Sequence, residues 1–369
     1  LVILWLMASC GGNGAQMRQQ LEALEQQNRS GEQMLNDSLA ESLVSYFDKH
    51  GDANERMRAK YILGRTYYCL GELPRALETY YEAADCADTT AADCDYKVLS
   101  RVYGQSSSVF EEQAQFRSQM EMLQKARFYA LKANDTLAAI EYYSLMTEPY
   151  RQLALYDSVV VIVDKAFLLF KKNQRDNRAS MMLVSAITSL IKIDSIEKAK
   201  RYIDNYEKNS GLFDECYNIQ KGREIYYYIK GEYYLAVHQL DSAEFIFRKE
   251  LREGKDMNNQ IAGCKGLQKV FEQRKNSDSI AKYANLGYIL NDSTYSLAEM
   301  QNIQKFQASY NYNHQKILAE QSISRAKMSM MWLIIIVVLF MMLTMLSYFW
   351  FKKYRADKEK ELAEYRLNL

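Results

Sequence analysis

The residue types that most often carry catalysis are few and scattered in this chain. Its three histidines, His50, His238 and His314, lie far apart in the sequence, and their surroundings suggest a helix end, a turn and a long helix. No phosphate-binding loop, H-E-x-x-H or C-x-x-C motif is present. Adjacent acids such as Glu111 and Glu112 are typical of a solvated helix face. We therefore expect a protein without enzymatic activity, cofactor or metal site.

One cysteine lies in a segment that can be chemically modified. Residues 1–10 form an apolar run that ends in Met7-Ala8-Ser9-Cys10, a pattern typical of a secretory signal. The last four residues resemble a bacterial lipobox, in which Cys10 would be acylated, although Leu is usual in place of Met7. The alternative is an uncleaved anchor with an incidental cysteine. Because no Met or basic segment precedes residue 1, we expect that the start of the signal is missing. Residues 11–15 are rich in glycine and predict a flexible tether.

Two further cysteines, Cys86 and Cys94, flank a short polar loop. In an oxidising compartment they could form a disulfide. The alternative is a pair of free thiols, because the spacing alone does not supply the geometry that a disulfide needs.

Composition favours helices. Proline occurs twice and glycine 15 times in 369 residues, whereas strong helix formers are plentiful. The net charge of +1 gives no basic field for nucleic acid, so we expect no nucleic-acid partner.

A spacing of small and large residues recurs along the chain. With Met57 as the first position, the seventh, eighth, eleventh, twentieth, twenty-fourth and twenty-seventh are Leu63, Gly64, Tyr67, Ala76, Tyr80 and Ala83. A second copy uses Tyr227, Gly231, Tyr234, Ala243 and Phe247. Small residues let paired helices approach, and large ones fill the space between pairs. The pattern resembles the tetratricopeptide repeat.

The number of repeats follows from a recurring triplet of Asp, Ser and an apolar residue, which predicts the capped start of the second helix in each pair. The triplets begin at Asp37, Asp157, Asp194, Asp241 and Asp278. Asp157 and Asp194 are separated by 37 residues, as are Asp241 and Asp278, but Asp194 and Asp241 are separated by 47. We predict an all-α, tetratricopeptide-like α-solenoid of about seven helix pairs over residues 16–294. Gln105–Ser108 would be a connection in it, and Pro149 should kink or split a helix.

The resemblance also implies a binding face. In tetratricopeptide arrays the first helix of each pair lines the concave surface, which binds a protein or peptide ligand. The matching positions here are Arg58, Tyr61, Arg65, Tyr68, Tyr228, Glu232, Lys265 and Lys269. The alternative for each is packing between repeats, or solvation.

A second unit follows the repeats. Residues 328–351 predict a transmembrane helix, because 330–351 carry no charge and have Trp332 and Trp350 near their ends. More basic residues follow this span, at Lys352, Lys353, Arg355, Lys358 and Lys360, than precede it, at Arg325 and Lys327. This asymmetry predicts a single-pass protein of the bacterial inner membrane, with its C-terminus in the cytoplasm and its repeats in the periplasm.

The segments beside the span leave two functions open. Residues 295–327 predict a juxtamembrane helix whose apolar stripe would either pack on the last repeat or form a homodimer; the stripe is Ile303, Phe306, Tyr310 and Ile317. Residues 352–369 predict a basic helix or the start of a coiled coil. Residues 307–316 resemble a juxtamembrane element of bacterial exported repeat proteins, some of which continue into an output domain. We expect a membrane-anchored scaffold, or the sensor half of a signalling protein whose output region is missing or supplied by a partner.

Overall fold

The structure is a computed structural model. It describes the backbone of residues 2–367 and the side chains of 14–293, 321–322, 324–360 and 362. The chain divides into two compact units, Leu1–Met300 and Gln301–Leu369.

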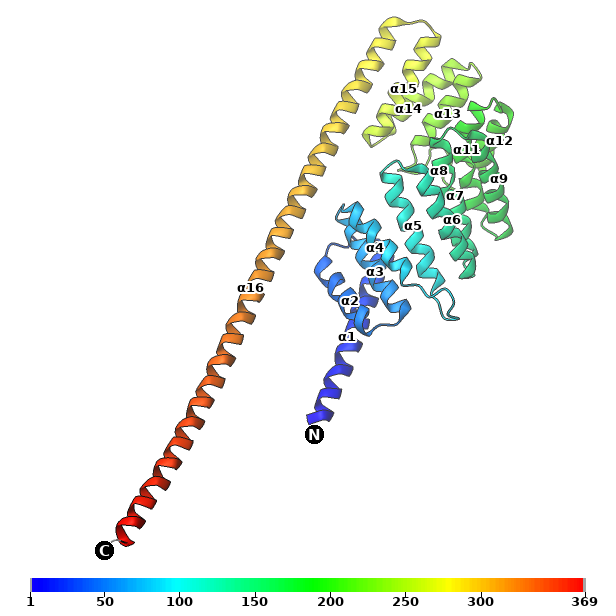
Figure 1. Ribbon diagram of the computed structural model, residues 1–369. Helices are drawn as coiled ribbons and strands as arrows, with labels where there is room; N and C mark the ends of the chain where they lie inside the picture. The colour runs from blue at the N-terminus through cyan, green and yellow to red at the C-terminus, as the bar shows by residue number, and fades with distance from the viewer. Residues whose placement is uncertain (1, 368–369) are drawn as a thin grey trace. The chain divides into compact units, whose positions relative to one another are not determined.

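The first unit is built from short helices packed side by side (Figure 1). Their bounds are α1 (Val2–Ser30), α2 (Asp37–His50), α3 (Ala53–Cys69), α4 (Leu73–Asp85), α5 (Tyr96–Glu112), α6 (Phe116–Lys132), α7 (Thr136–Leu145), α8 (Thr147–Gln152), α9 (Tyr156–Lys172), α10 (Asp176–Met182), α11 (Val184–Lys192), α12 (Ile196–Asn209), α13 (Ile225–Ala236), α14 (Leu240–Glu253) and α15 (Met257–Gln273). The final helix, α16 (Ser277–Leu367), starts in this unit.

Consecutive helices pack as pairs. The first helix of each pair, called the A helix below, is followed by its B helix. The pairs are α1–α2, α3–α4, α5–α6, α7/α8–α9, α10/α11–α12, α13–α14, and α15 with the first turns of α16. This arrangement confirms the predicted solenoid of about seven pairs.

Close A–B contact depends on the small residues that the repeat pattern singled out. Ala76 and Ala243 are completely buried, and so are the aromatic residues Tyr80 and Phe247. The ring of Tyr80 lies where a side chain on Gly64 would be. The core is therefore a series of small clusters between neighbouring pairs rather than one central core, as expected for a repeat protein.

The turns from A to B share one conformation. A residue with positive φ, such as Ala154 (56°) or His238 (57°), follows the A helix. The next N–H then donates back five residues, as from Leu155 to the carbonyl of Tyr150 at 2.9 Å. This closure satisfies a free carbonyl at the helix end.

The predicted Asp and Ser caps of the B helices are wrong. Because the left-handed turn starts α9 and α14 early, Asp157 and Asp241 lie inside the first turn, where their charges interact favourably with the helix dipole but do not cap the helix. Ser195 lies at the N-cap position of α12 without a side-chain hydrogen bond to the helix. Side-chain caps occur mainly on A helices, for example at Asp52 and Asp135.

Two interruptions were predicted, and one is present. The A helix containing Pro149 is split into α7 and α8, because proline has no N–H to donate to the carbonyl of Leu145. The connection predicted at Gln105–Ser108 is wrong, since these residues lie inside α5. The hydroxyls of Ser106 and Ser107 donate to carbonyls of the same helix, at 3.0 and 2.6 Å, so their polar groups are satisfied there.

The predictions for the two ends of the chain compare with the structure as follows. Residues 11–15, the predicted tether, lie within α1, and Cys10 lies outside the described side chains. Helix α16 runs without interruption through Asn291–Ser293 and the start of the predicted juxtamembrane helix. The predicted apolar stripe from Ile303 to Ile317 and His314 also lie outside the described side chains. Within α16, Ser324–Lys360 is long and apolar enough to cross a membrane, with a mean hydropathy of 2.6.

Candidate partner-binding surface

The A helices form a layer in which consecutive repeats meet: α3 contacts both α1 and α5, and α13 contacts both α11 and α15. All eight residues predicted to bind a partner lie on α3, α13 or α15. Their contacts show what they do in the folded chain.

Arg58 and Tyr61 join α3 to α1. The Arg58 guanidinium donates two hydrogen bonds to the carboxylate of Glu25, Nε to Oε1 at 2.6 Å and Nη2 to Oε2 at 2.7 Å. The bond to Glu25 raises the pKa of Arg58. Tyr61 is buried, and its hydroxyl accepts from Nδ2 of Asn28 at 3.3 Å. Both side chains therefore stabilise the contact between the first two repeats.

Arg65 and Tyr68 reach in both directions from α3. Arg65 donates from Nε to Oδ1 of Asn28 on α1 at 2.9 Å, and from Nη1 to Gln105 on α5. Its guanidinium also lies 5.2 Å from the ring centre of Tyr68. The Tyr68 hydroxyl donates to Glu112 on α5, and burial, followed by this bond, raises the Tyr68 pKa.

A similar bridge links α13 and α15. Lys269 donates to both carboxylate oxygens of Glu232, each at 2.9 Å, and to the hydroxyl of Tyr228 at 3.4 Å. Burial acts to lower the Lys269 pKa, but the Glu232 carboxylate outweighs it and the pKa is raised. Lys265 is exposed on α15, one helical turn away.

Seven of the eight predicted residues thus contact a neighbouring repeat, and Lys265 faces solvent. The sequence placed them on A helices correctly, but it did not identify their partners Glu25, Asn28, Gln105 and Glu112. The sequence signal that could have identified these partners is a separation of about one repeat, such as the 33 residues between Glu25 and Arg58. Binding of a partner by these eight residues remains a prediction.

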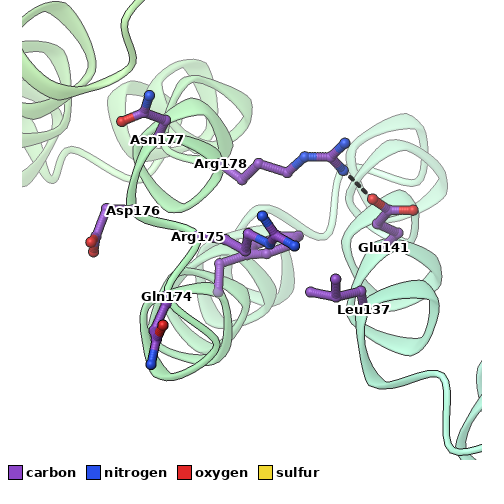
Figure 2. A pocket seen from close by; sticks show the side chains of 8 residues that line it. Leu137, Glu141, Gln174, Arg175, Asp176, Asn177 and Arg178 are labelled. Atoms are coloured by element: carbon purple, nitrogen blue, oxygen red, sulfur yellow. Dashed lines mark hydrogen bonds and ion pairs between the residues drawn. The ribbon is translucent and has the colours of Figure 1, made fainter.

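A pocket that the sequence did not predict lies where α7 approaches the start of α10 (Figure 2). Its volume is about 570 Å³. Arg178 pairs with Glu141 across it, and Arg175 extends from the α10 side toward Leu137 (Figure 2). Both arginines are exposed, so this pocket belongs to the solvated edge between repeats.

Glu250 on α14 is the most unusual ionisable group. It is completely buried, and neither carboxylate oxygen has a hydrogen-bond partner among the described residues. Burial, followed by the nearby charge of Glu224, raises its pKa to about 8. The carboxyl is therefore largely neutral near pH 7, and an acid of this kind destabilises the fold once it ionises.

No group of three His, Cys, Asp or Glu residues in the described part of the chain could hold a metal ion. Cys86 and Cys94 are half-buried and free in the structure, and burial raises the pKa of both thiols. Cys216 is exposed.

Comparisons with known proteins agree with the packing. No protein-family model and no curated protein sequence matches the chain. Among solved structures, the apo form of RapI is similar, with a TM-score of 0.56 and 12% identity, over 76% of this chain and 99% of RapI. A tetratricopeptide repeat protein from Parabacteroides merdae is similar with a TM-score of 0.50 and 14% identity, over 74% of this chain and 93% of that protein. The chain has a tetratricopeptide-like repeat fold.

Proposed function

We propose that this protein is a non-enzymatic, membrane-anchored scaffold whose A-helix layer binds a protein or peptide in the periplasm. The observation that carries the proposal is the pair of units within one chain, a seven-pair repeat array and an apolar helical span. Aromatic, Arg and Lys side chains line the A-helix layer, and such residues are common anchors of protein interfaces.

Site-specific photocrosslinking in cells tests the binding face. A photoreactive residue at Lys265, which is exposed on α15, should capture a defined partner. The matched control is Leu168, which is 65% exposed on the B helix α9. Capture at Leu168 but not at Lys265 would contradict the proposed face.

The proposed topology follows from the basic residues after the span and can be tested by labelling a native cysteine. Cys216 is exposed in the repeat unit. An impermeant maleimide should label it in cells whose outer membrane is permeabilised. In a Cys216→Ser background, Leu369→Cys should resist the same reagent. The opposite labelling pattern would reverse the orientation.

Lipidation at Cys10 is a separate part of the proposal. In a chain given a complete signal sequence, Cys10→Ala should abolish incorporation of an acyl probe. The variant should stay in the membrane fraction, because Ser324–Lys360 is long enough to anchor it. Release into the soluble fraction would show that this segment is not a membrane anchor.

A sensor half of a signalling protein is the second candidate. The favouring observation is that α16 is one uninterrupted helix from the last repeat through the apolar span, with no loop between them. If it signals, insertion of four glycines between residues 320 and 321 should abolish the output while leaving partner crosslinking at Lys265 unchanged.

A further inference from the structure

The connection between α12 and α13 departs from the rest of the array. Four other B-to-A connections, such as Gly51–Asp52 and Gly254–Asp256, contain two or three residues, and the one between α4 and α5 contains ten, whereas this one spans 210–224. The extra length accounts for the longer repeat interval between Asp194 and Asp241. A repeat array does not need this insertion to stack, so its structure and contacts are informative.

The insertion is well organised. Residues Gly211–Gly222, called the tongue below, fold back on themselves through an antiparallel bridge between Phe213 and Ile219. The Asp214 carboxylate accepts from the N–H groups of Cys216 at 2.9 Å and Asn218 at 2.7 Å. Tyr217 has a positive φ of 58° at the tip. The hydrogen bonds thus fix the tip in one conformation.

The tongue is anchored to both helices of the next pair. The N–H of Ile219 donates to the hydroxyl of Tyr227 on α13 at 3.1 Å, and Nζ of Lys249 on α14 donates to Oδ1 of Asn218 at 2.7 Å. Leu212 and Ile219 are buried in the core. The anchoring leaves a cavity of about 710 Å³ between the tongue, α13 and α14.

Two aromatic side chains at this cavity remain in solvent. Tyr217 at the tip of the tongue is 67% exposed, and Phe245 on α14 is 66% exposed. Tyr226, Tyr227 and Tyr234 also line the cavity. Exposed aromatic residues grouped around a concave site are typical of interface anchors.

The charges of the cavity are almost balanced, with one exception. Lys230 pairs with Glu207 at 2.5 Å, and Asp241 pairs with Arg274 at 2.5 Å. Lys249 forms no ion pair within 4 Å among the described residues; it contacts the Asn218 amide and the Tyr227 ring, 4.5 Å from the ring centre. Hydrogen bonds from Asn218, and to a smaller extent the charge of Lys249, lower the pKa of the Asp214 carboxylate in the tongue. The site therefore retains one ammonium group beside aromatic walls, a combination that attracts a carboxylate next to a large apolar group.

We propose that the tongue, α13 and α14 form a second recognition pocket, which binds an acidic peptide segment of a partner protein through an aromatic or large aliphatic side chain. The pocket uses Tyr226, Lys230 and Tyr234, which lie at spacings of four residues on the side of α13 opposite the predicted A-helix face. A saccharide suits the pocket less well, because the Glu207 and Asn218 side chains are already engaged in the contacts above.

The proposal can be tested with a random octapeptide phage library panned against the purified full-length chain in detergent. We expect enrichment of sequences with an acidic residue beside an aromatic or leucine residue. The synthetic consensus peptide should bind at least tenfold more weakly to Tyr217→Ala and to Phe245→Ala. The matched control is Phe128→Ala, which removes a 53% exposed ring from α6 and should not change binding.

Two further measurements make the test specific for the pocket. Replacing the acidic residues of the peptide by amides should weaken binding to the wild type but not to Lys249→Gln. The peptide should also slow maleimide labelling of Cys216, which lines the cavity. Equal affinity of the Phe245→Ala and Phe128→Ala variants, a consensus without acidic residues, or Phe245-dependent binding of an oligosaccharide panel in place of peptides would overturn the proposal. Crosslinking at Lys265 tests the A-helix face independently, so failure of either site leaves the other one testable.

Discussion

Gly64 on α3 lies directly against the ring of Tyr80 on α4, and a Cβ atom at Gly64 would come within 2.5 Å of the Tyr80 Cε1 atom. Tyr80 is completely buried, so its ring has little freedom to move aside. The corresponding residues of a later pair, Gly231 and Phe247, are arranged in the same way. This contact between an A helix and its B helix is what the repeat pattern encodes.

Gly64→Ala should therefore lower the midpoint of thermal unfolding, because overpacking typically costs ~1–3 kcal/mol. The matched control is Gly287→Ala on α16, where the added methyl would meet only Cβ of Cys264, at an ordinary 3.4 Å. Both changes gain the same intrinsic helix propensity, about 1 kcal/mol. Circular dichroism of the two variants should show opposite shifts, and a higher midpoint for Gly64→Ala would contradict the assigned repeat positions.

The sequence predicted the pairing of helices well because that information is local and repeated. Gly64 and Ala76 must be small, and Tyr80 must be large, for steric reasons that every tetratricopeptide-like helix pair shares. The turns were harder to predict, because the left-handed position carries Ala154 or His238 where glycine would have revealed it. A weak turn signal together with a strong Asp-Ser pattern led to the wrong caps.

The candidate sites were less predictable than the fold. Arg58 and Lys269 have the chemistry of interface anchors, yet they contact Glu25 and Glu232 of adjacent repeats. Whether such a side chain contacts the adjacent repeat or a separate binding partner depends on the angle between neighbouring repeats. Sequence spacing does not supply that angle. The tongue was visible only as a repeat interval ten residues longer than the 37-residue intervals on either side of it.

The left-handed turns predict a stabilising substitution. Ala154→Gly should raise the free energy of unfolding by roughly 0.5 kcal/mol. Removing a side chain at positive φ relieves ~1–2 kcal/mol of strain, but the greater conformational entropy of glycine in the unfolded chain offsets part of this gain. Chemical denaturation followed by circular dichroism measures the change. Ala284→Gly, at an exposed position inside α16, should instead lose about 1 kcal/mol. If both variants lose stability, the turn is not strained as described.

The Arg58–Glu25 pair should behave as a structural bridge. A double-mutant cycle of Arg58→Ala and Glu25→Ala should give a coupling energy of about 1 kcal/mol, above the usual value for exposed pairs because the bond is bidentate and half-buried. The coupling should decrease in 0.5 M salt. Additive effects of the two substitutions would show that the pair does not connect α1 to α3, and would leave Arg58 available for a ligand.

Glu250 should make the fold less stable as the pH rises. Its pKa is about 8 in the folded chain, above the ordinary value of 4.5, so the folded state binds more protons than the unfolded state throughout this window. Stability is thus fully present below pH 4.5 and is lost as the pH rises to about 8, at up to ~1.4 kcal/mol per pH unit. Glu224, Glu253 and Asp256 lie near enough to add to the penalty when they are ionised.

Glu250→Gln keeps the shape of the side chain but cannot ionise, so it should raise the unfolding midpoint at pH 8 and have little effect at pH 5. Denaturation curves of the wild type and the variant at half-unit pH steps test this expectation. Glu121→Gln, on the exposed surface of α6, serves as the control and should leave the pH profile unchanged. Parallel profiles for the wild type and Glu250→Gln would mean that Glu250 is ionised and solvated in the folded protein, and that the packing between α13, α14 and the start of α15 differs from the structure.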